Sequence, residues 1–184
     1  METLNVQATS HAVGSASDRL AEVQLRELAE ADLLGLEWEG AYTHYRRLYE
    51  IAYQRAMKGN AVLWVAERSE ILIGQLFVLL RSAVDPQAAD GRRRGFFHSF
   101  RVRPEYRGMG LGSRMLGTAE DDLRMRGFRW ASLNVARDNP AAIRFYERAG
   151  YQIMGAEEGR WSYQDHKGVE RHVHEPSWRM RKKL

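Results

Sequence analysis

The chain has 184 residues, of which 44% are hydrophobic and 28% are charged. This length encloses one moderate core and is short for two enzyme domains, so we expect a single domain. The formal net charge is +4, and this excess is matched by the basic residues of the last stretch alone, Arg179, Arg181, Lys182 and Lys183. The basic character is therefore local.

Cysteine is absent, which excludes disulfides, thiolate zinc sites and a mechanism that places an acyl group on a cysteine. His172 and His174 would share one face of a strand, but no carboxylate cluster supports them, so we expect no metal. The longest apolar run, residues 71–80, is too short to span a membrane, and no membrane partner is expected. The first residues lack a basic segment followed by an apolar one, so the default expectation is a cytoplasmic protein.

Residues 1–18 are rich in Ser, Thr, Ala and Gly without a hydrophobic period. We therefore expect a flexible leader followed by one domain over residues 19–184. Alternating apolar and polar residues in LAEVQLREL, from Leu20, predict a short first strand. Asp32 is a candidate N-cap for the following LLGLEW, and bulky residues at helical spacing over 42–57 predict a second helix. A helical pair thus follows the first strand.

Two runs of strand character come next, AVLWVAE at 61–67 and ILIGQLFVLL at 71–80, and the three residues between them are hairpin length. A loop with consecutive arginines at 92–94 leads to a further strand, FFHSFRV at 96–102. The arginines and the basic tail lack an aromatic RNA-binding signature or a helix-turn-helix pattern. A solvated loop is therefore favoured, and no nucleic-acid partner is expected.

The second half of the chain contains further predicted elements, which in order are a helix from 111 to Gly127, a strand at 130–135, a short helix from Asn139-Pro140 to Gly150, and a final hairpin. The whole order is β-α-α-β-β-β-α-β-α-β-β. This order predicts a mixed α/β fold.

The segment RGMGLG at 107–112 follows a strand and opens a helix, where first-turn amides have no intrahelical partner and the dipole favours an anion. Glycines let a pyrophosphate approach the backbone, and Arg107 adds a positive charge. A plain connection is the alternative. A Walker A loop is disfavoured because no Lys follows Gly110 or Gly112, and a Rossmann fingerprint because the next strand ends at Asn134 instead of an acidic residue.

The short helix reads NPAAIRFYERAGY at 139–151. Together with the glycine turn, it resembles the GNAT superfamily of N-acetyltransferases. In that family the cofactor motif is Arg/Gln-x-x-Gly-x-Gly/Ala, and the later helix often reads Asn-x-x-Ala-x-x-x-Tyr-x-x-x-Gly-Phe. The residues that carry the resemblance are Arg107, Gly110 and Gly112 in the turn, and Asn139, Ala142, Tyr146 and Gly150 in the helix. Tyr151 stands in place of Phe, and the resemblance is specific over residues 96–151.

The resemblance implies a GNAT fold, with a mixed, mostly antiparallel sheet of about six to seven strands flanked by about four helices. It also implies acetyl-CoA as the donor, bound in a V-shaped gap where the strands at 96–102 and 130–135 diverge. The residues expected to bind it are Phe100 and Val102 through their backbone, Arg107, Gly108, Gly110, Gly112 and Ser113 in the turn, and Asn139. For Asn139, a simple N-cap is an equal alternative.

Tyr146 is the expected catalytic acid, because family members have a tyrosine here that protonates the departing thiolate. The general base is left open. One branch of the family has a glutamate where this chain has Asn134, and an amide cannot act as a base. Many relatives have a glutamate near the position of His98, which is therefore the candidate base, with a packed strand residue as the alternative. Transfer is expected to be direct, within a ternary complex.

The acceptor implied by the resemblance is a primary amine of a small molecule or peptide, bound by residues 36–45 and 157–166. The candidate acceptor residues combine carboxylate and aromatic groups that suit a cationic amine, and are Glu37, Trp38, Tyr42 and Trp161. Solvated charge beside core aromatics is the alternative. The favoured function is an N-acetyltransferase, as a monomer or homodimer. A CoA-binding regulatory or interaction module without turnover is the second, because of Asn134.

Overall fold

The computed structural model describes residues 20–184, so the predicted leader, residues 1–18, lies outside the described residues. The strands are β1 (Gln24–Glu27), β2 (Ala61–Arg68), β3 (Ile71–Leu79), β4 (Arg94–Val102), β5 (Trp130–Ala136), β6 (Gln152–Glu157), β7 (Arg160–Gln164), β8 (Glu170–His174) and β9 (Ser177–Lys183). The α-helices are α2 (Arg46–Met57), α3 (Leu111–Met125) and α4 (Pro140–Arg148), and the 3-10 segments are η1 (Glu30–Glu37), η2 (Thr43–Tyr45) and η3 (Pro104–Tyr106).

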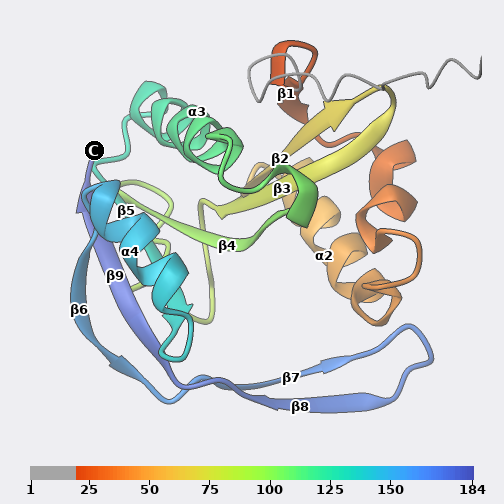
Figure 1. Ribbon diagram of the computed structural model, residues 1–184. Helices are drawn as coiled ribbons and strands as arrows, with labels where there is room; N and C mark the ends of the chain where they lie inside the picture. Colours follow the sequence, from red (N-terminus) through yellow and green to blue (C-terminus); the bar gives the residue numbers. More distant parts are fainter. Residues whose placement is uncertain (1–19) are drawn as a thin grey trace, which may run out of the picture.

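Seven strands form one sheet in the order β1-β2-β3-β4-β5-β9-β6, and β7 and β8 form a separate pair (Figure 1). Neighbouring strands of the large sheet are antiparallel except β4 and β5. The predicted mixed, mostly antiparallel sheet is therefore confirmed.

The sheet carries a hydrophobic core on each face. In β2, Val62 and Ala66 belong to the core beneath α3, while Leu63 and Val65 belong to the core beneath α2. Because both faces are buried, β2 is a continuous apolar run in the sequence and does not alternate with polar residues. Helices α3 and α4 cover one face, and α2 with η1 covers the other (Figure 1).

The sheet opens between β4 and β5. Their pairing joins Arg94–Phe97 to Trp130–Leu133 and stops there, whereas β5 stays paired with β9 as far as Ala136. Ser99 has a φ of 52° where the register of β4 against β3 shifts, which marks a β-bulge that bends the strand. The buried Gln75 amide donates to the Ser99 carbonyl at 3.1 Å. The second half of β4 therefore diverges from β5, as predicted.

The first strand and the first helix differ from the prediction. Leu20 lies in a helical turn, and β1 begins only at Gln24. Asp32 is not an N-cap, because it lies inside η1, where its carboxylate accepts the Ala29 N–H at 2.7 Å and pairs with Arg26. These contacts tie the segment to the end of β1, and it forms a 3-10 helix.

The predicted helix over 42–57 is also shorter than expected. Its first residues form η2, and the α-helix begins at Arg46. Trp38 and Glu39, which directly follow η1, have φ values of 45° and 54°. This left-handed turn reverses the chain between η1 and η2, a conformation that side-chain periodicity does not reveal.

Helix ends with specific capping residues follow the prediction. Helix α3 ends at Met125, followed by Gly127 with a φ of 83°. At the start of α4, Asn139 Oδ1 accepts the Ala142 N–H at 3.0 Å, and Pro140 occupies the first turn.

The predicted final hairpin is four strands. Strands β6 and β9 both join the large sheet, and β7 and β8 between them form the separate pair, which extends toward α2 (Figure 1). Arg47 of α2 donates to the Gln164 side chain of β7 at 3.0 Å. Over residues 20–184, no helix has the length and apolar character needed to cross a membrane.

Candidate functional site

The glycine turn between β4 and α3 presents backbone amides to solvent. Gly108 and Gly110 have φ values of 73° and 92°, a left-handed backbone that other residues adopt with strain. Gly110 is the N-cap of the 15-residue α3, and no side chain caps that end. A Cβ at either glycine would meet no atom within 4 Å. The turn is an open cradle of donors at the positive end of α3, suited to an anion such as a diphosphate.

Arg107 and Ser113 border this cradle. The exposed Arg107 donates from Nε to the Val102 carbonyl at 2.9 Å, which holds its guanidinium between the turn and the end of β4. Ser113 is exposed in the first turn of α3 and lines a groove of about 300 Å³ between α3 and α4, together with the cations Arg148 and Lys182. Glu120 lines the same groove and pairs with Lys182 at 2.6 Å, so the positive charge beside the turn comes from Arg107 and Arg148.

The free edge of β4 faces the gap. In an antiparallel pair, successive residues point their backbone groups alternately toward the partner and away from it. The Arg103 N–H donates to the Ile73 carbonyl of β3 at 2.8 Å, so Val102 directs its N–H and C=O toward the gap. By the same alternation Phe100 lies on this free edge. An extended ligand can pair with this edge as an added strand would, although the Val102 carbonyl already accepts one hydrogen bond from Arg107.

Tyr146 lies on α4 beside this gap. Its ring is 5.1 Å from the Phe145 ring and 5.8 Å from the Tyr151 ring, and Phe145 in turn contacts Phe100 of β4 at 6.1 Å between ring centroids. Burial raises the pKa of the Tyr146 phenol above its usual value. The phenol therefore keeps its proton at neutral pH and is a donor.

His98 lies on the opposite face of the sheet from α4. It is half-buried between the rings of Phe77, at 5.7 Å, and Phe96, at 6.4 Å, and its Nδ1 is 3.1 Å from Ser99 Oγ. Burial, helped by the charge of Arg55, lowers the pKa of His98 to about 4. The imidazole is therefore neutral at pH 7 and able to accept a proton, although weakly.

The two predicted acceptor segments, 36–45 and 157–166, come together on this face. Tyr163 of β7 is 5.1 Å from the Tyr45 ring and 6.4 Å from the His44 ring. Trp161, which is 41% exposed, lies 5.3 Å from Tyr163. The β7–β8 hairpin thus extends an aromatic surface that begins at η2.

The carboxylates of the first segment are already paired. Glu37 is buried, bonds Thr43 at 2.6 Å and pairs with Arg46, whose guanidinium holds the pKa of Glu37 below its usual value. Glu39 is paired with Arg103 at 2.7 Å. Arg46 and Arg103 therefore already occupy the two carboxylates that a cationic acceptor amine would need.

The sequence did not single out Arg101, which has an unusual place between the predicted acceptor residues. Its guanidinium carbon is 3.8 Å from the Tyr42 ring centroid and 5.6 Å from that of Trp38. Tyr45 and Tyr49 surround it at 5.8 and 5.7 Å. Helical spacing indicated that these tyrosines share a face, but only the fold shows that this face meets an arginine of β4.

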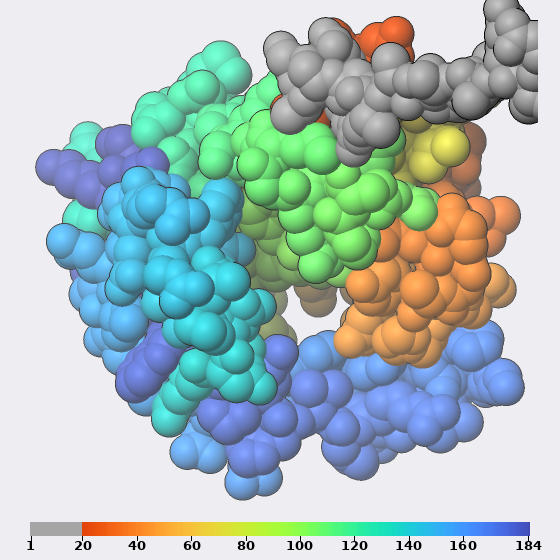
Figure 2. Space-filling model, viewed as in Figure 1, coloured from red at the N-terminus to blue at the C-terminus, as the bar shows by residue number. Residues whose placement is uncertain are grey.

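Figure 2 shows an opening in the molecule between these two halves of the site. It is bordered by α4 on one side, the α2 region on the other, the chain around η3 above and the β7–β8 hairpin below (Figures 1 and 2). The opening lies below the diverging half of β4, so a molecule entering it can reach the gap.

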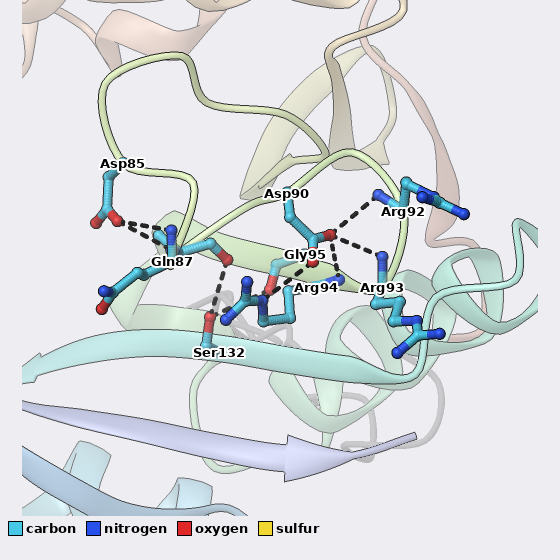
Figure 3. Close-up of polar contacts among 9 residues, drawn as sticks. Asp85, Gln87, Asp90, Arg92, Arg93, Arg94, Gly95 and Ser132 are labelled. Atoms are coloured by element: carbon cyan, nitrogen blue, oxygen red, sulfur yellow. Dashed lines mark hydrogen bonds and ion pairs between the residues drawn. The ribbon is translucent and has the colours of Figure 1, made fainter.

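The arginines at 92–94 lie at the other end of β4. The Asp90 carboxylate accepts the backbone N–H groups of Arg92, Arg93 and Arg94 at 2.7 to 3.0 Å and the Arg94 Nε at 3.2 Å (Figure 3). Burial alone would raise the pKa of Asp90, but the three backbone donors outweigh it and lower the pKa. Asp90 thus shapes the turn that starts β4. Over residues 20–184, no group of three or more His, Asp or Glu side chains is placed to hold a metal ion.

Comparison with known proteins identifies the family of this chain. Residues 25–151 match the model of the acetyltransferase (GNAT) family, and the chain belongs to that family. It is 28% identical to a probable N-acetyltransferase camello of Xenopus tropicalis over 151 residues, which cover 80% of this chain and 66% of the relative. It is 30% identical to a mycothiol acetyltransferase of Cellulomonas flavigena over 88 residues, 47% of this chain and 25% of the relative. The chain therefore spans less than two thirds of the length of these relatives.

Solved structures share the fold. Ard1 of Thermoplasma volcanium has a TM-score of 0.68 at 18% identity, over 89% of this chain and 99% of that one. Naa50 of Arabidopsis thaliana, solved with the bisubstrate analogue CoA-Ac-MVNAL, has a TM-score of 0.65 at 19% identity, over 89% and 100%. The spermidine/spermine N-acetyltransferase SpeG of Vibrio cholerae has a TM-score of 0.64 at 19% identity, over 89% and 93%. The predicted GNAT fold is therefore confirmed.

Proposed function

We propose that this protein is an acetyl-CoA-dependent N-acetyltransferase that transfers the acetyl group directly to a primary amine. The observation that carries the proposal is the divergence of β4 from β5 beside the open glycine turn, with α4 bordering the same gap. Family membership supports it, as does the neighbour solved with a CoA-based bisubstrate analogue. When bound, acetyl-CoA supplies an activated acetyl thioester.

The chain's own residues divide the binding of this donor between them. The amides of Gly108, Gly110 and Gly112, with Ser113 and Arg107, would hold the diphosphate. The free backbone edge at Phe100 and Val102 would pair with the pantetheine arm. Asn139 uses its side-chain oxygen to cap α4, so its amide NH₂ remains available as a donor to the same ligand.

The proposed reaction needs three functions around the thioester. The amine nitrogen attacks the carbonyl carbon, and a backbone N–H of the free β4 edge near Val102 that does not pair with the pantetheine arm stabilises the oxyanion. His98 receives the amine proton, directly or through water, because it is neutral at pH 7. As the carbon–sulfur bond breaks, the Tyr146 phenol protonates the sulfur. The cycle closes when the phenolate regains a proton from solvent and His98 releases its proton to solvent.

The acceptor is a primary amine of a small molecule or a peptide. Relatives of both kinds support this class, because SpeG is named for spermidine and spermine and the Naa50 analogue contains a peptide. The surface around Glu37, Trp38, Tyr42 and Trp161 would receive it, with the aromatic rings as its main contacts because Glu37 is paired with Arg46.

A thiol-release assay with acetyl-CoA and a panel of primary amines tests this proposal. The expected result is amine-dependent release of CoA. Asn134, exposed in the diverging half of β5, keeps open the alternative of a CoA-binding module without turnover. Tight CoA binding without amine-dependent thiol release at any pH from 6 to 9 would reject the enzyme and favour that module.

A further inference from the structure

Arg101 is a cation without an anionic partner in the described part of the chain. It follows Phe100 in the diverging half of β4 and lies within the aromatic residues of the acceptor face, Trp38, Tyr42, Tyr45 and Tyr49. Its Nη2 donates to the Tyr49 hydroxyl at 2.5 Å. No salt bridge reaches it from residues 20–184.

Several hydrogen-bond donors on this face lack an acceptor. Arg101 Nε and Nη1 are buried without a partner in residues 20–184, and the same holds for the indole N–H of Trp38 beside them. Buried donors that make no hydrogen bond are uncommon and costly, most of all when they are charged. Such a group of donors indicates a missing acceptor.

Three acidic side chains of this face are paired elsewhere, and the exposed Glu175, whose charge acts on Tyr45, forms no salt bridge with Arg101 within residues 20–184. Glu37 is held by Arg46 and Thr43, Glu39 by Arg103, and the buried Asp165 by Arg171 at 2.9 Å and by backbone N–H groups. Burial and the positive charges of Arg101 and Arg171 lower the pKa of His44 on the same surface. The acceptor face is therefore short of negative charge at Arg101.

A strained turn lies above the guanidinium. Trp38 and Glu39 have positive φ values, which cost energy for residues with side chains and are often found at functional sites. This turn carries Tyr42, whose ring covers the guanidinium at 3.8 Å. Movement of this one ring would uncover one face of the Arg101 guanidinium.

We infer that Arg101 binds a carboxylate of the acceptor, so that the acceptor is an amino acid or a related molecule with both an amine and a carboxylate. This inference rests on the proposed function. The carboxylate displaces the Tyr42 ring and accepts hydrogen bonds from Arg101 and from the Trp38 indole. The surrounding tyrosines favour an apolar or aromatic side chain on the acceptor. The amine then points from Arg101 toward the free edge of the same strand.

Matched acceptors separate this role from a purely structural one. We would compare L-phenylalanine, L-phenylalaninamide and phenethylamine, and L-leucine with L-leucinamide, by thiol release. The kcat/KM of the wild type should be about 10- to 100-fold higher for the free acids than for the neutral analogues. The reason is that a neutral analogue leaves the buried donors of Arg101 without an acceptor. Arg101→Met should remove this preference mainly through KM and leave the neutral amines within about threefold.

Two further variants keep the result interpretable. Arg47→Met removes an exposed arginine of the same face that bonds Gln164 and should retain the preference. Arg101→Lys keeps the charge and should retain part of it, and acetyl-CoA binding reports whether each variant is folded. Equal use of acids and amides by the wild type, or an equal loss on all acceptors in Arg101→Met while acetyl-CoA still binds, would overturn the inference and leave the proposed function standing.

Binding of reaction products tests the inference without turnover. N-acetyl-L-phenylalanine should bind the CoA complex of the wild type at least about tenfold more tightly than N-acetyl-L-phenylalaninamide, and Arg101→Met should abolish the difference. If no amine is acetylated but this difference is seen, the proposed function fails while the carboxylate site stands. If the two products bind equally, the carboxylate site is rejected.

Discussion

The burial of His98 predicts how strongly the free energy of unfolding depends on pH. The folded protein holds the pKa of His98 at about 4 through burial and Arg55, whereas an ordinary histidine titrates near 6.5. Between these values the unfolded chain binds a proton that the folded chain does not, so the free energy of unfolding falls as the pH falls. The loss is about 1.4 kcal/mol for each pH unit inside this window. From pH 7 to pH 5, His98 alone should cost about 2 kcal/mol.

Urea unfolding of the wild type and His98→Gln at pH 8, 7 and 5 measures this contribution. The wild type should lose about 2 kcal/mol more than the variant between pH 7 and pH 5. The two should change nearly in parallel between pH 8 and pH 7, where His98 is mostly neutral in both the folded and the unfolded state. The same pH dependence in both proteins over the whole range would refute the reasoning. It would show that His98 is solvated, and the case for a neutral base inside the site would lose its physical support.

Three other predictions address the donor site and the core. Tyr146→Phe should lower kcat by about 10- to 100-fold with little change in acetyl-CoA binding, because it removes only a proton donor. Gly110→Ala should weaken acetyl-CoA binding by about tenfold or more, because its Cβ enters the cradle and strains the turn. Lys182→Met should lower the free energy of unfolding by about 2–3 kcal/mol, because Lys182 pairs at 2.6 Å with the buried Glu120.

The glycine and lysine predictions each have a control in the chain. Gly127→Ala introduces the same left-handed strain at the other end of α3, also with no atom within 4 Å of the new Cβ, and should leave acetyl-CoA binding unchanged. Arg160→Met breaks an exposed pair with Glu158 and should change stability by less than about 1 kcal/mol. Unchanged kcat in Tyr146→Phe, equal effects of the two glycine variants on acetyl-CoA binding, or equal stability of the two ion-pair variants would contradict these explanations.

Local patterns in the sequence predicted the elements that rest on local physics. The apolar runs of β2 and β3 predicted strands correctly, because both faces of these strands are buried. Asn139-Pro140 predicted the start of α4 correctly, because the Asn139 side chain and the proline ring act on the first turn of the same helix. The glycine turn was found for the same reason, since a left-handed backbone at Gly108 and Gly110 is a property of these residues themselves.

Features that depend on distant partners were missed. Ser99 gives no signal for a bulge, which arises where the register of β4 against β3 shifts. The composition of segment 36–45 suggested free carboxylates, but Arg46, nine residues beyond Glu37, neutralises one of them. Arg101 looked like an ordinary strand residue, because the four rings around it come from the residues between η1 and η2, from η2 and from α2.

A crystal structure of the protein with CoA bound would test the proposed catalytic gap directly. We expect diphosphate oxygens within hydrogen-bond distance of the backbone N–H groups between Arg107 and Ser113. We also expect the pantetheine arm along the free edge of β4, with its sulfur next to Tyr146 Oη. A diphosphate bound elsewhere, or a sulfur remote from Tyr146, would contradict the assignment of this gap as the catalytic site.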